Sequence, residues 1–398
     1  MYRQRVEART LCGAGTIKRK ECMKRVITVT SGKGGVGKTN ICVNLAVQFA
    51  GAGLRPCIFD ADLGLANINI LMGIHPEHTL EEVVNGEKRI QDILIHDTCG
   101  VDIIPGGTGV EKLAAMTPEG VSQLIESFSC LEDYDVLFFD TSAGISRDVL
   151  SFCLASQEVL LVVTSEPTSL TDGYSLLKVL SLNGYRDPVK VVMNKAKNER
   201  FARAVFDKFN ETVKQYLPIE ISYAGCLPAD ETVSAAVTRQ RPFTLLYPSS
   251  RAAASIEQLA EFLLDNPGAG TSDITFEKFW EKYMEVAGTR LKLPKRKKTK
   301  PAKAPDTVQN SPQPSLSKAP VSTGDNSLSG QVLASLNQLT TVITDMSAEF
   351  KEFRRSLTEQ TNGSAAPGDP ENDQVAPQLP PIIPLDFEAY KKKKQNEN

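Results

Sequence analysis

The stretch that decides the fold is Gly32-Lys33-Gly34-Gly35-Val36-Gly37-Lys38-Thr39. It follows an apolar run, Val26–Thr30, and precedes apolar residues at helical spacing, so it matches the phosphate-binding pattern G-x-x-x-x-G-K-S/T in the strand-loop-helix context that this pattern requires. Glycines let backbone N–H groups turn toward phosphate oxygens, and the N-terminus of the helix adds partial positive charge. The sequence therefore predicts that this stretch and Asn40 cradle phosphate groups. Lys38 is expected to bridge the outer phosphates and the Thr39 hydroxyl to ligate Mg²⁺.

Short apolar strands alternate with helical segments throughout the part of the chain that follows this loop. We predict strands at Val26–Thr30, Cys57–Phe59, Val101–Ile104, Asp135–Phe139, Val159–Val163, Val189–Met193 and Ala224–Cys226. Such an alternation predicts an α/β fold with a mostly parallel sheet that helices cover on both faces. Ligands bind such sheets beyond the carboxyl ends of the strands, where the informative polar residues lie.

Two carboxylates follow predicted strands at that edge. Asp62 comes after the second strand, where it can orient an attacking water opposite the γ-phosphate, although an aspartate at a strand end is often only a cap. Asp140 ends the very apolar strand Val136–Phe139, and burying its carboxylate would be costly without a metal ion and water. We therefore predict that Thr39, Asp62 and Asp140 lie at a Mg²⁺ site.

A second lysine, Lys33, lies inside the loop and by itself could be an ordinary solvated charge. With it, Lys-Gly-Gly-Val-Gly-Lys-Thr resembles the deviant phosphate loop of the MinD/ParA/nitrogenase-iron-protein class of ATPases, which are P-loop NTPases of the SIMIBI type. The resemblance continues through three further stretches: Asp60-Ala-Asp62-Leu-Gly64-Leu-Ala-Asn67, Asp140-Thr-Ser-Ala-Gly144 and Asn194-Lys195. It covers about residues 24 to 264.

This resemblance implies ATP and Mg²⁺ as ligands and a homodimer that forms on ATP binding. Lys33 would reach across the dimer interface to the nucleotide of the partner subunit, so Lys33, Lys38 and Asp62 are the implied catalytic residues. The backbone of Gly144 would approach and sense the γ-phosphate. Asn194 would read adenine, although it could be a turn asparagine, and Pro228 would flank the base.

Within the class, the stretches 60–73, Thr79-Leu-Glu-Glu-Val and Ile104-Pro-Gly-Gly107 look most like the flagellar-number regulators called FlhG or FleN. The resemblance implies a switch that sets flagellar number or placement. The alternatives are a division-site or DNA-partitioning ATPase and, from another class, a nucleotide-dependent scaffold with negligible turnover. Members of the group often carry an N-terminal Asp-Gln-Ala-x-x-Leu-Arg segment that stimulates the GTPase FlhF, and residues 1–24 contain none. An FlhF-type GTPase and flagellar basal-body proteins are therefore open partner assignments.

The composition changes near residue 290, since twelve of the 23 prolines follow Leu293. We predict a basic N-terminal extension (1–23), an ATPase domain (24–266), an amphipathic helix (271–289), a basic and then Pro/Ser-rich linker (290–326), a heptad segment (327–359) and a disordered tail (360–398). The heptad segment carries an apolar a/d seam whose partner is either its own copy or another helix. The basic run after residue 289 is a candidate contact for nucleic acid or a transcription regulator.

The predicted helix Ile274–Ala287 has an apolar face made of Phe276, Phe279, Trp280, Tyr283 and Ala287. Beside the basic run, this face favours contact with anionic lipid on the inner side of the cell membrane. Packing on the protein's own body and binding to another protein are the alternatives, and three glutamates on the polar face count against lipid.

The remaining composition excludes several classes of protein. The net charge of −3 argues against a polyelectrolyte that coats nucleic acid, and no apolar stretch approaches the 18 residues of a membrane span. The N-terminus lacks the apolar core of a signal peptide, so we expect a cytoplasmic protein. Buried, reduced thiols are expected at Cys12, Cys22, Cys42, Cys57, Cys99, Cys130, Cys153 and Cys226, which contain no C-x-x-C pair.

Overall fold

The structure is a computed structural model that describes residues 24–62, 67–107, 124, 126–268, 276–288 and 291. The predictions for the N-terminal extension, the linker, the heptad segment and the tail concern residues outside these ranges, apart from Leu291. All six cysteines of the described ranges are free thiols. Cys42, Cys57 and Cys153 are buried as expected, whereas Cys99, Cys130 and Cys226 are partly exposed, contrary to the expectation.

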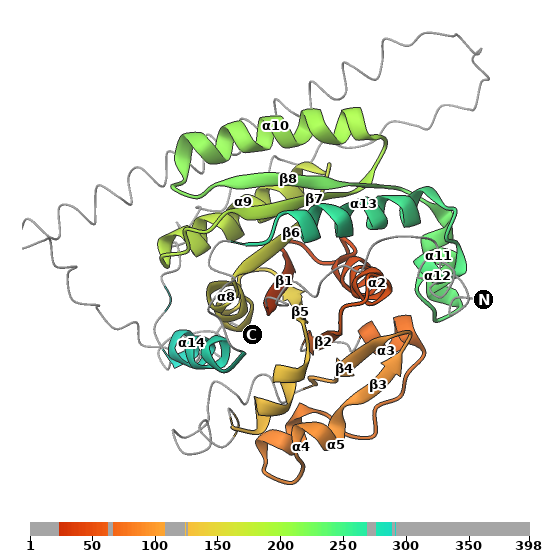
Figure 1. Cartoon of the computed structure of the whole chain (residues 1–398). Helices are drawn as coiled ribbons and strands as arrows, with labels where there is room; N and C mark the ends of the chain where they lie inside the picture. Colours follow the sequence, from red (N-terminus) through yellow and green to blue (C-terminus); the bar gives the residue numbers. More distant parts are fainter. Residues whose placement is uncertain are drawn as a thin grey trace, which may run out of the picture.

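One eight-stranded sheet organises the described residues (Figure 1), in the order β3-β4-β2-β5-β1-β6-β7-β8. Its strands are β1 (Arg25–Ser31), β2 (Pro56–Ala61), β3 (Ile95–Thr98), β4 (Val101–Ile104), β5 (Val136–Ala143), β6 (Glu158–Thr164), β7 (Val189–Ala196) and β8 (Ile221–Pro228). All neighbouring strands run parallel except β3, which pairs antiparallel with β4. Every residue of β1, β2 and β6 is buried, which is why apolar residues dominate the middle of these strands.

Helices cover both faces of the sheet (Figure 1). They are α2 (Lys38–Gly51), α3 (Asn67–Met72), α4 (Leu80–Val84), α5 (Ile90–Ile93), the 3₁₀ helix η1 (Phe128–Asp133), α8 (Arg147–Ala155), α9 (Pro167–Leu182), α10 (Glu199–Tyr216), α11 (Glu231–Thr238), α12 (Phe243–Leu246), α13 (Arg251–Asp265) and α14 (Phe276–Gly288). One core joins α2, α12 and α13 to the sheet, and a second joins α8, α9 and α10 to its other face. The predicted α/β fold is confirmed.

All seven predicted strands are present, but two of them continue past their predicted ends, and this changes where two site residues lie. β5 continues to Ala143 and β7 to Ala196, so Asp140 and Asn194 lie within strands and not after their ends. β3 was not predicted, because its four residues include the exposed His96 and Asp97 and lack an apolar pattern.

The expected lipid contact of the aromatic helix is corrected by the structure. In α14, Phe276, Phe279, Trp280, Tyr283 and Ala287 are each at most 1% exposed, and the helix packs on α8 and η1. The side chains of a third core cluster, including Phe59, Phe139 and Phe152, lie beneath it. A helix that covers a protein core shows the same periodicity as one that lies on lipid, so the pattern alone could not distinguish the two.

The free energy gained by burying the aromatic side chains of α14 exceeds the cost of burying two of its hydrogen-bond donors without partners. The Trp280 ring stacks on Phe128 with centroids 4.1 Å apart, and each large side chain buried there contributes about 1.5–3 kcal/mol. Trp280 Nε1 and the Tyr283 hydroxyl find no hydrogen-bond partner among the described residues, at a cost of about 1–3 kcal/mol each. The burial of four aromatic side chains therefore stabilises the packed helix by more than the two unpaired donors destabilise it. Within the described ranges, no helix combines the length and apolar character needed to cross a bilayer.

Candidate nucleotide site

The loop between β1 and α2 needs glycine at two positions for different reasons. At Gly32, a Cβ atom would overlap the backbone of Asp172 in α9, so only glycine lets the loop pass this helix. Gly37 has φ 97°, in the left-handed region, and a Cβ atom there would also overlap the side-chain amide of Asn194. Gly34 and Gly35 face open space, although Gly35, with φ 73°, also lies in the left-handed region.

Two side chains from β7 hold the loop from outside. Asn194 Nδ2 donates to the Val36 carbonyl at 2.6 Å, and Lys195 Nζ donates to the Gly35 carbonyl at 2.8 Å. Asn194 Oδ1 accepts from the Lys195 N–H at 2.8 Å, so both ends of this amide are in use. The structure gives Asn194 a role in shaping the loop, and its expected contact with adenine stays a prediction. Lys195 was missed, although its place directly after Asn194 was the available signal.

Lys38 lies at the start of α2 and is almost buried, with 7% of its surface exposed. Burial lowers the pKa of its ammonium group, while the nearby carboxylates of Asp140 and Asp62 raise it. The ammonium group of Lys38 is therefore close enough to Asp140 and Asp62 to be stabilised by their charges.

Asp140 is the most unusual group of the site. Both carboxylate oxygens are buried and find no hydrogen-bond partner among the described residues. Burial raises the pKa of Asp140 to about 7, against the opposing effect of the nearby Thr39 hydroxyl and Lys38, and Asp62 raises it further. The Thr39 hydroxyl is thus close enough to favour the ionised form without making a hydrogen bond of normal geometry.

A second buried carboxylate stands beside it. Asp60 of β2 is paired in register with Asp140 of β5 and is 2% exposed. Burial, and then the charge of Asp140, raise the pKa of Asp60 well above its usual value. We did not assign Asp60 to the site from the sequence, although it closes an apolar run as Asp140 does.

The residues present fit a magnesium ion bound together with phosphate. In the described ranges, no three His, Cys, Asp or Glu side chains could enclose a metal by themselves. Mg²⁺ commonly takes one or two protein oxygens and completes its shell with phosphates and water. The unpaired Asp140 oxygens next to the Thr39 hydroxyl supply such a partial set.

Asp62 directly follows β2 and is half-buried. Its N–H donates to Asp60 Oδ1 at 3.2 Å, and its Oδ2 accepts from Asn67 Nδ2 at 3.2 Å. Its charge acts on both Lys38 and Asp140, so the structure brings it to the phosphate loop as expected.

Gly144 and Pro228 also end strands at this edge. Gly144 has φ 104° and open space where a side chain would lie, but its N–H donates to the Ser31 carbonyl at 2.8 Å and is not a free donor. Pro228 pairs in register with Ala196 at the carboxyl end of β7, close to the Asn194 end of the site.

Lys33 is bound within its own chain. Its Nζ donates to Glu166 Oε2 at 2.7 Å and to Thr168 Oγ1 at 3.0 Å, at the start of α9. The two charged side chains are 39% and 65% exposed, so the pair lies at the surface. Any contact of Lys33 with a second subunit requires these two bonds to break.

Comparison with known proteins agrees with this geometry. The ParA family model, described as NUBPL iron-transfer P-loop NTPase, matches residues 22–264, and the chain belongs to this family of P-loop NTPases. Antiactivator FleN of Pseudomonas aeruginosa is 41% identical over 238 residues, which are 60% of this chain and 85% of that protein. Flagellum site-determining protein YlxH of Helicobacter pylori is 29% identical over 269 residues, covering 66% and 91%.

Solved structures match the same part of the chain. The cell division ATPase MinD of Pyrococcus furiosus is 27% identical, with a TM-score of 0.50 over 61% of this chain and 99% of that one. MinD of Pyrococcus horikoshii, solved as a complex with Mg-ADP, is 25% identical, with a TM-score of 0.50 over 63% of this chain and 100% of that one.

Proposed function

We propose that this chain is an ATP-hydrolysing, dimerising switch that regulates flagellar number or placement. The observation that carries the nucleotide part is the buried, unpaired Asp140 carboxylate beside Lys38 and the Thr39 hydroxyl. The flagellar part is supported by the similarity to FleN and to YlxH, and by the stretches that resemble the flagellar-number regulators. Division-site placement is the alternative within the family, because MinD proteins are among the solved structures that match.

The phosphates of ATP would lie in the loop, with Lys38 on the outer phosphates and the backbone N–H groups around them. Thr39 and Asp140 would hold Mg²⁺, which neutralises charge that develops on the phosphoryl group. Binding would give the Asp140 oxygens ligands and so offset the cost of burying this carboxylate. Asp62, half-buried and hydrogen-bonded by Asn67, would orient the attacking water.

Dimerisation would use Lys33. In the proposal, Lys33 exchanges Glu166 and Thr168 of its own chain for the phosphates bound by a second subunit. That exchange is inexpensive, because exposed ion pairs contribute only about 0–1 kcal/mol. A switch built this way responds to ATP without first disrupting a buried contact.

The remaining partner assignments are also proposals. We propose a cytoplasmic protein that meets the inner face of the cell membrane or nucleic acid through the basic run after residue 289, since the aromatic face of α14 is buried. An FlhF-type GTPase, basal-body proteins, a transcription regulator and a partner of the heptad segment are candidates for the cargo.

The test measures ATP turnover and light scattering with a slowly hydrolysed ATP analogue. Lys38→Ala should abolish nucleotide binding, because the glycines position phosphates but cannot replace the lost charge. Lys33→Ala should bind ATP normally but stay monomeric, and Asp62→Ala should form a dimer that turns over poorly. Dimerisation with negligible turnover in the unaltered chain would favour the scaffold alternative.

The flagellar assignment needs a separate measurement. Expression in a flagellated bacterium that lacks its own FleN-like protein should restore the normal number of flagella, counted by electron microscopy. Restoration of division-site placement in a strain lacking MinD, without an effect on flagella, would contradict the assignment.

A further inference from the structure

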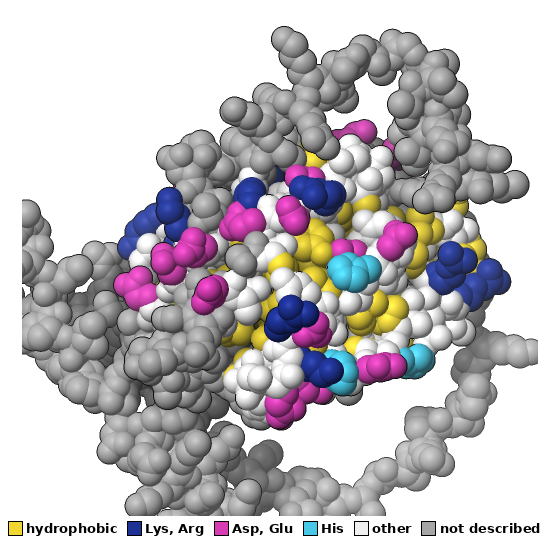
Figure 2. Space-filling view, turned by 60° about the horizontal axis from the view of Figure 1, so that its bottom comes forward, with side chains coloured by type: hydrophobic (Ala, Val, Ile, Leu, Met, Phe, Trp, Pro, Cys, Tyr) yellow, Lys and Arg dark blue, Asp and Glu magenta, His cyan; other side chains and the backbone are white. Residues whose placement is uncertain are grey.

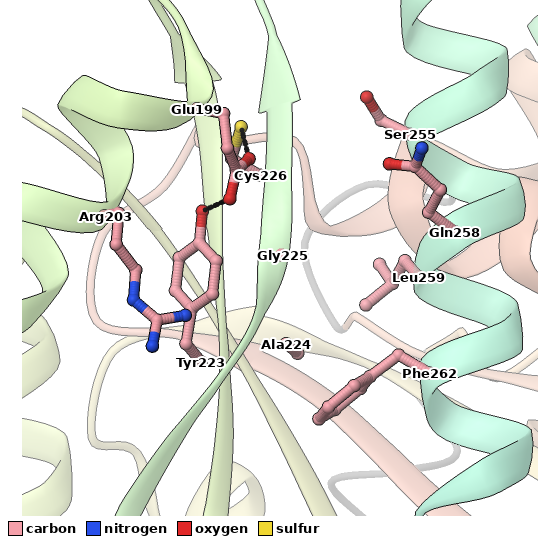
Figure 3. Close-up of a pocket in the computed structure, with 10 residues that line it drawn as sticks. All are labelled: Glu199, Arg203, Tyr223, Ala224, Gly225, Cys226, Ser255, Gln258, Leu259 and Phe262. Carbon is pink, nitrogen blue, oxygen red and sulfur yellow. Dashed lines mark hydrogen bonds between the residues drawn. The ribbon is translucent and has the colours of Figure 1, made fainter.

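Two surfaces away from the nucleotide site carry polar side chains that bond to one another. In the groove of about 340 Å³ between α10 and α13 (Figure 3), Glu199 accepts hydrogen bonds from the Tyr223 hydroxyl and the Cys226 thiol, each at 2.8 Å. Figure 2 looks onto the side of the molecule that carries β3, where acidic, basic and histidine side chains are interspersed. There, His96 Nδ1 lies 2.9 Å from Asp102 Oδ2. Because these groups already have partners, they mark a ligand site less clearly than free donors of the phosphate loop do.

The phosphate loop holds two such free donors. The N–H groups of Val36 and Gly37 make no hydrogen bond to another described residue. On the opposite side of the same peptide groups, both carbonyls are bonded to β7. The Gly35 carbonyl accepts from Lys195 Nζ at 2.8 Å, and the Val36 carbonyl accepts from Asn194 Nδ2 at 2.6 Å. Each of these two peptide groups is therefore held by its oxygen and keeps its N–H available for a ligand.

The planar peptide group connects the bonded carbonyls with the free donors. Every peptide bond of the described residues is trans, and in a trans peptide the carbonyl and the following N–H point in opposite directions. The bond from Lys195 to the Gly35 carbonyl thus turns the Val36 N–H away from β7, toward the inside of the loop. Asn194 does the same for the Gly37 N–H. Backbone N–H groups that point into such a loop are the donors that bind phosphate oxygens.

The end of β7 is bent in a way that lets both side chains reach the loop. In a regular strand, consecutive side chains point to opposite faces of the sheet. Lys195, however, has φ 54°, in the left-handed region, and the pairing of β7 with β8 shifts register between Met193 and Ala196. Asn194 Oδ1 also accepts from the Lys195 N–H at 2.8 Å, which holds the bend. A strained conformation of this kind persists where the surrounding structure fixes it, and it is typical of functional sites.

We infer that Asn194 and Lys195 are positioning residues that aim two backbone N–H groups, those of Gly37 and Val36, at the phosphates. Lys195 acts through a charged donor, and hydrogen bonds that form a chain polarise one another, so the Val36 N–H also becomes a stronger donor. The inference rests on the proposed function, because it assigns the phosphates of the nucleotide to this loop. It differs from the predicted contact of Asn194 with adenine, since orienting the loop requires no base.

Inorganic tripolyphosphate is the probe that separates these two roles, because it has phosphates and no base. Its affinity and that of ATP, each with Mg²⁺, are measured by calorimetry on the full chain. Lys195→Met keeps the apolar stem and removes the charged donor, so it should lower both affinities by the same factor, about tenfold. Lys195→Arg keeps a charged donor and should recover part of this loss. Lys197→Met removes the same charge from an exposed lysine two positions further on, and it should change both affinities by less than about twofold.

The backbone signals of the loop give a readout that a general loss of structure would not reproduce. In protein with isotope-labelled valine and glycine, the amide nitrogen of a residue responds to the hydrogen bond on the preceding carbonyl, because that bond polarises the peptide group. Lys195→Met should therefore shift the Val36 signal in nucleotide-free protein and leave Gly37 nearly unchanged, and Asn194→Ala should do the reverse. If Asn194→Ala fails to fold, which its other signals would show, the Lys195 variants alone decide.

Three results would overturn the inference. Unchanged affinity for tripolyphosphate in Lys195→Met, with or without weaker binding of ATP, would show that Lys195 does not orient the loop. An equal loss in Lys197→Met would mean that the affinity follows net charge. Shifts spread over all the labelled residues of the loop would indicate a general change of structure. Failure of the unaltered chain to bind either ligand would instead contradict the proposed function itself, so the two failures can be told apart.

Discussion

The two ends of the sheet both bury charged groups, but only one end satisfies them. At the amino ends of β1, β6 and β7, Arg25 and Glu158 pair through two bonds of 2.7 and 2.8 Å, and Lys190 donates to Glu158 and, at 2.5 Å, to the Asn266 carbonyl. Arg25 also donates to the Leu263 carbonyl at 2.9 Å, so the network ties the end of α13 to the sheet. Toward the carboxyl ends, the Asp140 carboxylate finds no hydrogen-bond partner among the described residues.

The titration of the two carboxyl groups reflects this difference. Burial raises the pKa of Asp140 to about 7. Burial alone would also raise the pKa of Glu158, but Arg25 and Lys190 outweigh it and hold this pKa below its usual value. A buried charge with all its partners belongs to the architecture, whereas a buried charge without them marks a place for a ligand.

The largest expected effect is on folding, at the satisfied end. Glu158→Ala should lower the free energy of unfolding by about 3–5 kcal/mol, because it leaves Arg25 and Lys190 as unpaired buried cations. Urea denaturation followed by circular dichroism measures this. A loss below 1 kcal/mol would mean that water or another carboxylate already balances the two cations.

Replacing the buried carboxylate at the other end of the sheet, Asp140, should change stability in the opposite direction. Without nucleotide, Asp140→Asn should raise the free energy of unfolding, since it removes an unpaired buried charge. Affinity for Mg-ATP should fall by at least about tenfold, as measured by calorimetry. Glu158→Gln is the control, with reduced stability but unchanged affinity. Reduced stability of Asp140→Asn would show that Asp140 has a structural partner, and the comparison would fail.

The next largest effect is on the pH dependence of stability, which should distinguish Asp140 from Glu158. For Asp140 the pKa in the folded state is raised above the unfolded value, so the folded domain takes up the proton first as pH falls through about 7. The nucleotide-free domain should therefore gain stability between pH 8 and pH 5.5, and Asp60 contributes in the same direction. Glu158 has a lowered pKa, and its contribution is lost only below this window. Thermal unfolding with and without Mg-ADP measures the gain, and a loss of stability toward pH 5.5 would contradict the prediction.

The smallest effect concerns an ion pair that is satisfied but exposed. Glu166→Gln weakens the hold on Lys33 and should lower the ATP concentration needed for half-maximal dimerisation by about two- to fivefold, in line with the strength of exposed pairs. Glu211→Gln, which removes the similarly exposed partner of Lys208 on α10, is the control and should have no effect. An increase in the required ATP would show that Glu166 supports the dimer and does not restrain Lys33.

The sequence was sufficient for the fold and the phosphate loop because both depend on local patterns. Residues 32–39 act through consecutive backbone groups, and the buried strands are contiguous apolar runs. Asp60 and Lys195 were missed because each acts through a neighbouring strand or loop that only the folded chain brings close. The Arg25–Glu158–Lys190 network joins residues up to 165 positions apart in sequence, and nothing at any one of them indicates the others. The position of α14 depends on which surface needs covering, which its own periodicity does not specify.

The buried position of α14 also gives the protein an intrinsic fluorescent probe. Trp280 is the only tryptophan of the chain and lies fully buried, stacked on Phe128. The fluorescence excited selectively in this indole therefore comes from a single site, and its emission wavelength follows the polarity around one helix. A shift to longer wavelength on adding ATP, lipid vesicles or a partner protein would register departure of α14 from the domain, in the unlabelled protein and in real time.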